Sequence, residues 1–162
     1  MNLKNASILS IALALIAAPL ACAAQDIAVV GLDGHAVTLT MKDFGDLPRA
    51  KAMLGEGASA KTYEGATLTS ILRLVDAPAG ARLHGKPVKD YVLVTGADGF
   101  SGLMSLAETD AELHRGVAII ADKSEGGPLA AKEGAYRLVV DGDLKPFRSV
   151  RKVVRIELKA AP

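Results

Sequence analysis

Two Asp-Gly dipeptides, at positions 33–34 and 98–99, each lie between two apolar runs of strand length. The flanking runs comprise residues 27–30, 35–39, 91–94 and 100–106. Asp-Gly supplies the positive φ that a tight turn needs, so each dipeptide predicts a β-hairpin. Local pairing of short strands must therefore be the basis of the fold.

Short helices are expected between the strands. Thr40 is suited to cap a helix over residues 40–44. Thr67 is suited to cap a second helix, which reaches Val75 and cannot continue past Pro78. The remaining segments are a helix over 106–113, strands over 49–54, 117–120, 137–140 and 150–158, and loops over 55–59 and 124–128. Because short strands outnumber the helices and alternate with them, the sequence predicts an α+β domain.

The first 24 residues have the organisation of a secretory signal peptide. Lys4 provides a positive start, residues 8–20 form an apolar run, and residues 21–24 offer small side chains for cleavage. The run is too short for a membrane anchor, which needs about 20 apolar residues. We therefore expect export to the periplasm and one mature domain over residues 25–162.

Cys22 is the single cysteine of the chain. In a lipoprotein it would become the acylated first residue, but a small side chain is expected where Leu20 stands. Lipid anchoring at Cys22 is therefore not expected. Under either route of processing the folded domain has no usable thiol, which excludes a disulfide framework and a CxxC site.

Charge and composition exclude several functional classes. The 162 residues include 19 Lys and Arg against 18 Asp and Glu, with three Tyr, three Phe and no Trp. Nucleic-acid binding favours a basic excess and aromatic rings, so a nucleic acid is not an expected partner. His35, His84 and His114 lack the spacing of metal ligands. The sequence has no GxSxG nucleophile elbow, and no GxGxxG or Walker motif follows a predicted strand, so nucleotide cofactors of those types are not indicated.

The most unusual segment is a basic cluster over residues 145–152. Strand alternation places Val150, Val154, Ile156 and Leu158 on one face, and Arg151, Arg155, Glu157 and Lys159 on the other. One interpretation is a solvated outer face of the last strand. The other is a site for an anion or a heterocycle, because the guanidinium groups of Arg148 and Arg151 and the hydroxyl of Ser149 suit such a ligand.

Asp98 has two interpretations as well. At a hairpin tip it is most often a turn residue. If it faces a pocket, its carboxylate can accept two hydrogen bonds from the amino group and ring N–H of a pterin or guanine.

Five segments, taken in order, resemble one known family. They are residues 37–48 (VTLTMKDFGDLP), 63–72 (YEGATLTSIL), 96–100 (GADGF), 127–129 with 134–140 (GPL, GAYRLVV), and 148–151 with 154–157 (RSVR, VRIE). In this order they are similar to the oxidoreductase molybdopterin-binding domain, the sulfite-oxidase-like (SUOX) family. The resemblance covers almost all of residues 25–162 and implies an α+β, mixed-sheet SUOX-type fold with short helices.

The resemblance also implies a ligand site. In this family the segment matching Arg148, Ser149 and Arg151 contacts the pterin cofactor. Phe100 is then a candidate stacking surface. Glu56, in a glycine-flanked loop, and Asp98 are candidates for reading the donor edge of a planar ligand.

One departure from the family decides the expected function. Molybdenum enzymes of the family carry a ligating cysteine in the stretch that corresponds to residues 49–60, where this chain has none. Met53 is a weak donor and Glu56 a hard one, so neither replaces a thiolate. The resemblance thus implies a pterin as ligand in preference to a molybdenum cofactor, and it is closest to small exported pterin-binding proteins of the PruR type.

Three functional hypotheses follow. The first is an exported, non-catalytic module that binds a pterin and signals to a membrane-bound partner in the periplasm. The second is a sulfite-oxidase-like molybdenum-cofactor oxidoreductase, or a subunit of one. The third is an interaction domain without a small ligand, since a fold does not by itself define a function.

Overall fold

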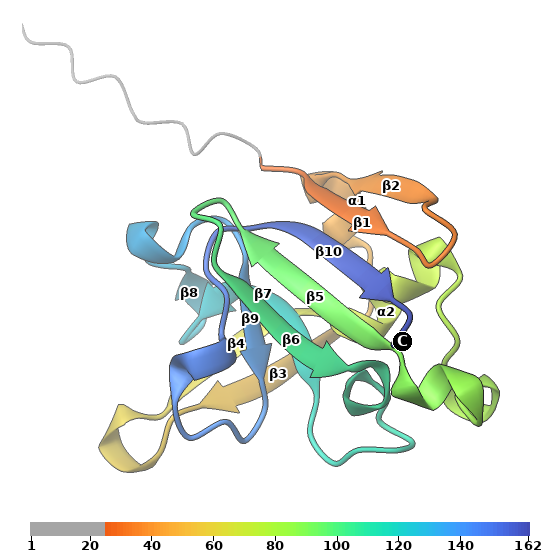
Figure 1. Cartoon of the computed structure of the whole chain (residues 1–162). Helices are drawn as coiled ribbons and strands as arrows, with labels where there is room; N and C mark the ends of the chain where they lie inside the picture. The colour runs from red at the N-terminus through yellow and green to blue at the C-terminus, as the bar shows by residue number, and fades with distance from the viewer. Residues whose placement is uncertain (1–24) are drawn as a thin grey trace, which may run out of the picture.

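The computed structural model shown in Figure 1 describes residues 25–162. The signal peptide predicted over residues 1–24, including Cys22, lies outside the described residues. Within 25–162, no helix is long and apolar enough to span a membrane.

The first of two sheets is built around the two predicted hairpins (Figure 1). Its strands are β1 (Ile27–Val30), β2 (Ala36–Leu39), β5 (Tyr91–Gly96), β6 (Ser101–Ser105) and β10 (Val153–Lys159), in the order β2-β1-β10-β5-β6. The β1–β2 and β5–β6 pairs are antiparallel hairpins, which confirms both Asp-Gly predictions. Because β1 pairs in parallel with β10, the sheet is mixed.

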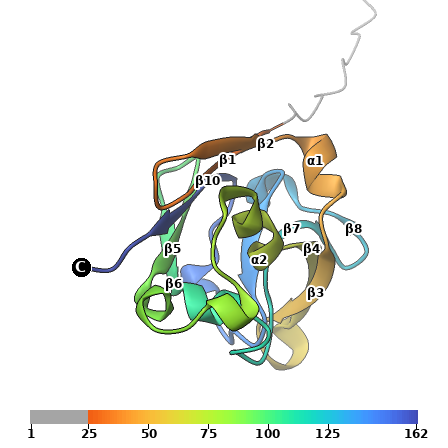
Figure 2. The ribbon, with the colours of Figure 1, turned by 90° about the vertical axis from the view of Figure 1, so that its right-hand side faces the viewer.

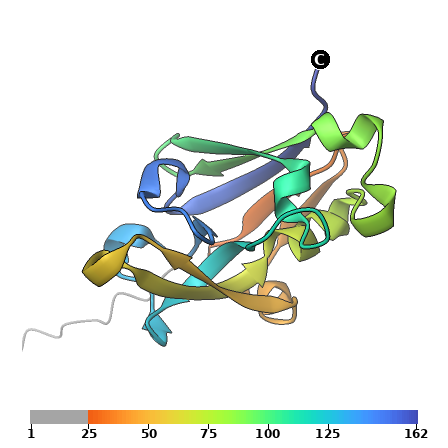
Figure 3. The same ribbon diagram turned by 90° about the horizontal axis from the view of Figure 1, so that it is seen from below.

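The second sheet contains the middle of the chain and packs against the first as a separate layer (Figures 2 and 3). Its strands are β3 (Arg49–Leu54), β4 (Lys61–Thr67), β7 (Ala118–Ser124), β8 (Gly127–Pro128) and β9 (Arg137–Val140). The order is β3-β4-β7, and both β8 and β9 pair with β7. All pairs in this sheet are antiparallel.

Two short α-helices begin at the predicted caps. The hydroxyl of Thr40 accepts a hydrogen bond from Asp43 N ahead of α1 (Met41–Gly45), and that of Thr67 accepts from Ser70 N ahead of α2 (Leu68–Leu72). Single turns of 3₁₀-helix cover Gly57–Ser59, Arg73–Val75, Gly80–Arg82, Lys86–Lys89, Leu106–Thr109, Ala131–Glu133 and Pro146–Arg148. The expected α+β class with mixed sheets is therefore confirmed.

The main core lies between the two sheets and is completed by α2. Among its largest buried side chains are Ile27, Val29, Leu39, Leu68, Ile71, Leu72, Ile120, Leu138 and Ile156. A smaller apolar cluster lies on the other face of the second sheet and contains Ala52, Leu54, Tyr63, Ile119, Ala121 and Val139. Strand β9 contributes to both, because Leu138 and Val140 face the main core while Val139 faces the smaller cluster. Both faces of this sheet are therefore partly covered.

Several segments differ from the sequence-based expectation. The second helix, expected to reach Val75, is α-helical only to Leu72 and continues over Arg73–Val75 as a 3₁₀ turn. The helix expected over 106–113 is only a 3₁₀ turn over Leu106–Thr109, held by a capping box between Ser105 and Glu108. The loop expected over 124–128 is a tight turn between β7 and β8, because β7 extends to Ser124.

The last strand begins later than predicted. Lys152 has a positive φ of 51°, and β10 starts at Val153 with an irregularity in its pairing with β5. This local change of direction shifts the alternation, so Val153 is fully buried and Val154 is not. The prediction that Val154 shares the core face of Ile156 and Leu158 is therefore wrong.

Candidate functional site

A cavity of about 410 Å³ opens where three connections meet. They are the β3–β4, β8–β9 and β9–β10 connections, and its charged lining residues are Lys61, Lys132, Glu133, Arg137, Lys145 and Arg151. Figure 3 shows the β3–β4 turn and the segment before β10 at the same end of the molecule, where Gly55 N donates to Asp143 O at 2.8 Å. With five cationic side chains and one carboxylate, the lining is strongly positive. We call this space the cationic cavity.

Arg137 forms the buried part of the cavity wall. It opens β9 on the same side as Val139, away from the main core, and it is only 4% exposed. Its Nη1 donates to the carboxylate of Glu133 and, at 2.9 Å, to the hydroxyl of Tyr63. The guanidinium carbon lies 5.0 Å from the centre of the Tyr63 ring. Arg137 is thus held by one ion pair, one phenol and one aromatic face.

Ser149 fixes the other side of the same guanidinium. Its hydroxyl accepts from Arg137 Nε at 2.8 Å and donates to the carbonyl of Leu138. Among residues 25–162, Nη2 of Arg137 has no hydrogen-bond partner, while every fully buried side-chain nitrogen and oxygen has one. The free end of Arg137 therefore reaches the cavity surface as a preoriented donor.

Burial and charge set the protonation of the groups around Arg137. Burial alone would raise the pKa of Glu133, but the hydrogen bonds and the charge of Arg137 hold that pKa below its ordinary value. Burial raises the pKa of Tyr63, with Glu133 adding to the rise and Arg137 opposing it. Glu133 is therefore ionised and Tyr63 neutral near pH 7.

The cations nearer the mouth are largely free to meet a ligand. Within the described part of the chain, the side chains of Lys61, Lys132 and Arg151 form no hydrogen bond or ion pair. Lys145 donates to Glu56 at 3.1 Å. Leu54, Leu144 and Pro146 supply apolar surface beside these charges. The arrangement suits a ligand with an apolar or planar body and an anionic or acceptor-rich edge.

Arg148 points to other partners. Its guanidinium binds both carboxylate oxygens of Asp143, at 2.9 and 3.0 Å, and donates to Glu108 at 3.0 Å. Hydrogen bonds to Asp143, opposed in part by burial, raise the pKa of Arg148 above its ordinary value. Arg148 does not line the cationic cavity but fastens the β9–β10 connection, which forms one of its walls.

Asp98 and Phe100 lie at the tip of the β5–β6 hairpin. Asp98 accepts a hydrogen bond from Phe100 N at 3.1 Å, as a turn residue does, and the Phe100 ring is about half exposed. The hairpin lies against the segment that precedes β10, because a Cβ atom on Gly96 would come within 2.4 Å of Arg151 O. Neither Asp98 nor Phe100 lines the cavity.

The structure thus brings together half of the sequence-predicted site. Arg151 lines the cavity. Ser149 accepts a hydrogen bond from Arg137, which lines it, and Glu56 forms an ion pair with Lys145, which also lines it. Arg148, Asp98 and Phe100 lie outside the lining. That any of these six residues binds a pterin stays a prediction.

Several lining residues were missed by sequence reasoning. Lys61, Lys132, Glu133 and Arg137 come from three separate stretches of the chain. Only Arg137 carries a usable signal, because an arginine that opens an apolar strand must find a partner or a ligand when that strand is buried.

The site does not fit molybdenum. Residues 25–162 contain no cysteine, and no group of three or more His, Cys, Asp or Glu within them could hold a metal ion. The cavity offers ammonium and guanidinium donors, which repel a cation and attract an anion. The donor set of the described residues therefore suits an anionic or acceptor-rich ligand and not a metal ion.

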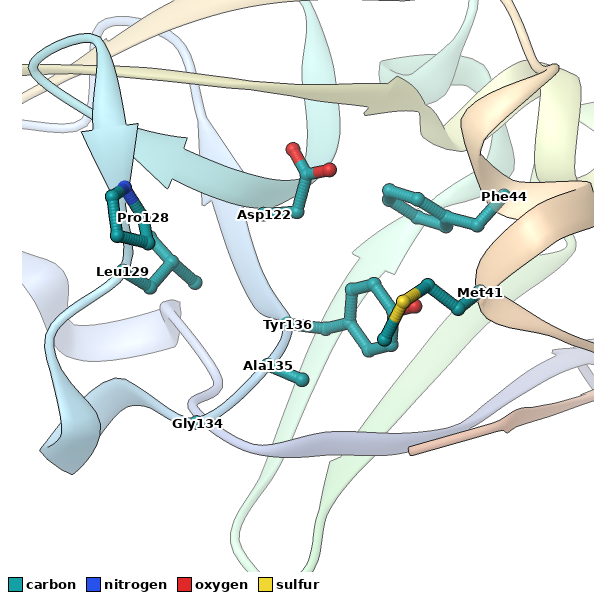
Figure 4. A pocket seen from close by; sticks show the side chains of 8 residues that line it. All are labelled: Met41, Phe44, Asp122, Pro128, Leu129, Gly134, Ala135 and Tyr136. Carbon is teal, nitrogen blue, oxygen red and sulfur yellow. The ribbon is translucent and has the colours of Figure 1, made fainter. Parts of the chain in front are cut away.

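A second hollow, of about 220 Å³, is mostly apolar (Figure 4). Met41 and Phe44 of α1 lie beside Tyr136 on one side of it, with Pro128 and Leu129 on the other, and the Phe44 and Tyr136 rings have centres 4.6 Å apart. Its single acidic group, Asp122, already accepts from Arg49. The cationic cavity, with its free charges, is therefore the candidate functional site.

The two-layer α+β architecture can be compared with that of solved structures. Among solved structures, the chain is similar to the sulfane dehydrogenase SoxCD from Paracoccus pantotrophus, with a TM-score of 0.58 and 18% sequence identity. The similarity covers 83% of this chain and 38% of that chain, so this chain spans well under half of its neighbour's length. At this identity the similarity shows the fold alone, and it confirms the expected α+β, SUOX-type fold. Neither a scan against protein-family models nor a search of curated proteins finds a match.

Proposed function

We propose that residues 25–162 form an exported, non-catalytic module that binds a pterin and signals its occupancy to a membrane-bound partner in the periplasm. The observation that carries this proposal is the cationic cavity. There the buried Arg137 and the exposed Arg151 line one solvent-open cavity on a SUOX-type fold.

The chemistry of the cavity supports a pterin that carries an anionic substituent. The ring carbonyl and ring nitrogens of a pterin accept hydrogen bonds, which Arg137 and Arg151 can donate. A phosphate or carboxylate substituent would be attracted by Lys61 and Lys132, which lack a carboxylate partner in the described chain. A volume of about 410 Å³ is within the range of small-molecule sites.

The absence of a thiolate in residues 25–162 supports a non-catalytic role. Molybdenum chemistry needs soft ligands that this part of the chain does not provide. The proposal therefore assigns binding to the cavity and no redox step.

Export and signalling rest on two further features. The signal-peptide pattern over residues 1–24 supports a periplasmic site of action. On the β9–β10 connection, Leu144 at the edge of the cavity and Phe147 outside its lining are 58% and 83% exposed. Exposed apolar side chains next to a ligand site suit contact with a partner protein.

A fluorescence titration of the mature domain with reduced and oxidised pterins tests the proposal. We expect micromolar or tighter binding and at least a tenfold loss in Arg151→Ala, equivalent to about 1.4 kcal/mol. Arg155→Ala is the matched control, because it removes the same side chain from an exposed position of β10 that does not line the cavity.

Two outcomes would count against the proposal. Binding of no pterin would leave the fold without its proposed ligand and favour an interaction domain. Equal losses in Arg151→Ala and Arg155→Ala would show that binding reflects overall charge and not the cavity.

A further inference from the structure

Among residues 25–162, one ion pair bridges the mouth of the cationic cavity. Lys145 Nζ lies 3.1 Å from Glu56 Oε1, and the two side chains are 59% and 56% exposed. Glu56 belongs to the β3–β4 connection and Lys145 to the β9–β10 connection. The pair therefore joins two walls of the cavity at its solvent side.

Lys145 differs in this respect from the other cations near the mouth. Lys61, Lys132 and Arg151 have no carboxylate partner among the described residues, whereas Lys145 has Glu56. Glu56 itself does not line the cavity. The Glu56 carboxylate thus pairs with the Lys145 ammonium group, which would otherwise be available to an anionic ligand.

We propose that Glu56 is a built-in competitor for the anionic group of the ligand. In the free protein its carboxylate holds Lys145, and a phosphate or carboxylate on the ligand replaces it there. Glu56 thereby weakens binding and favours strongly charged anions over weakly charged ones. This inference rests on the proposed function for the identity of the site, and it adds that Glu56 competes with the anionic group of the ligand for Lys145.

The exchange needs no opening of the cavity walls. Backbone hydrogen bonds also hold the β9–β10 connection in place, from Gly55 N of the β3–β4 connection to Asp143 O at 2.8 Å and from Gly142 N to Met53 O of β3 at 3.2 Å. Asp143 is further held by both ends of the Arg148 guanidinium. Only the two exposed side chains need to change rotamer, which is a fast and local motion.

The expected effect is small but has a definite sign. Exposed ion pairs contribute little, so removing the competing carboxylate should tighten anion binding by about two- to fivefold. If Glu56 instead accepted hydrogen bonds from the ligand, its removal would weaken binding.

Calorimetric titration of the mature domain with inorganic pyrophosphate tests the competition. We expect Glu56→Gln to bind two- to fivefold more tightly than the unmodified chain. Glu64→Gln is the matched control, because it removes the same charge from a carboxylate that pairs with Arg49 away from the cavity. Glu64→Gln should leave the affinity unchanged.

A double-mutant cycle assigns the effect to Lys145. In a Lys145→Gln background, Glu56→Gln should no longer change the affinity for pyrophosphate. An undiminished effect in that background, equal tightening in Glu64→Gln, or weaker binding in Glu56→Gln would each overturn the inference.

The same variants separate this inference from the proposed function. If pyrophosphate shows the Glu56 effect but no pterin binds, the proposed function fails and the inference stands. If a pterin binds through Arg151 and Glu56→Gln weakens it, the proposed function stands and the inference fails. If neither molecule binds, both are overturned.

Discussion

The contact between Arg137 and Glu133 joins two charges that are both more than nine-tenths buried. Removing one partner from such a pair leaves the other charge without compensation in a low-dielectric environment. The pair also orients the free end of Arg137 toward the cavity. Stability and binding therefore depend on the same two side chains.

Arg137→Met should lower the free energy of unfolding by about 3–5 kcal/mol, because Glu133 would remain buried and unpaired. Urea denaturation measures this loss. The control Arg155→Met breaks only the exposed pair with Glu157 and should cost at most about 1 kcal/mol. Equal effects of the two substitutions would contradict the structural role of Arg137.

The lowered pKa of Glu133 predicts a loss of stability in acid. A carboxylate whose pKa is lower in the folded state stabilises that state fully above its unfolded pKa, about 4.5, and less as the pH falls through the folded value. We expect the unfolding free energy to decline below about pH 4.5, with a shallower decline in Glu133→Gln. Urea titrations across this range measure both slopes, and parallel curves would contradict the prediction.

Among the structural elements, the β5–β6 hairpin positions the segment that leads into the cavity. Ala97 N donates to Lys152 O at 2.9 Å, and glycines at positions 96 and 102 allow close approach to the carbonyls of Arg151 and Arg148. A side chain at either glycine would force this contact apart. The hairpin therefore determines where the Arg151 backbone lies.

Gly96→Ala should destabilise the fold by about 1–3 kcal/mol and weaken ligand binding, because its Cβ would lie 2.4 Å from Arg151 O. Gly45→Ala is the control, since no atom lies within 4 Å of a Cβ placed there. Thermal unfolding and ligand titration of both variants measure the two effects. Unchanged stability in Gly96→Ala would show that this contact is not required.

The elements also show how far sequence reasoning reaches. The hairpins and helix caps follow from local chemistry, since Asp-Gly, Thr40 and Thr67 act on their own neighbours. The start of β10 could not be foreseen, because its change of direction occurs at Lys152, a residue type that rarely adopts positive φ. Burial at that point is decided by packing between sheets.

At the scale of the whole molecule, the cavity is assembled from connections far apart in sequence. The basic segment before β10 indicated Arg151 and Ser149 as site residues. Lys61, Lys132 and Glu133 become part of the site only because the pairing of β3, β4, β7 and β9 brings their segments together. The resemblance to SUOX domains supplied the fold, whereas the partners of Arg148 required the three-dimensional structure. Long-range packing was the information that the sequence alone did not contain.

The excess of cations in the cavity predicts a strong dependence of binding on salt. Affinity for an anionic pterin should fall as ionic strength rises from about 0.05 to 0.5 M, because salt screens the attraction. Titrations at several salt concentrations measure the slope. Arg151→Ala should reduce the slope and Arg155→Ala should not, and a slope of zero in the unmodified domain would contradict an anion-binding cavity.

The central claim is that the cavity holds a pterin without molybdenum. The most direct measurement is a joint analysis of pterin and molybdenum in protein isolated after expression of all 162 residues, with Arg151→Ala prepared in parallel. We predict bound pterin in the unmodified protein, much less in Arg151→Ala, and no molybdenum in either. One molybdenum per chain, or no pterin in the unmodified protein, would contradict the account.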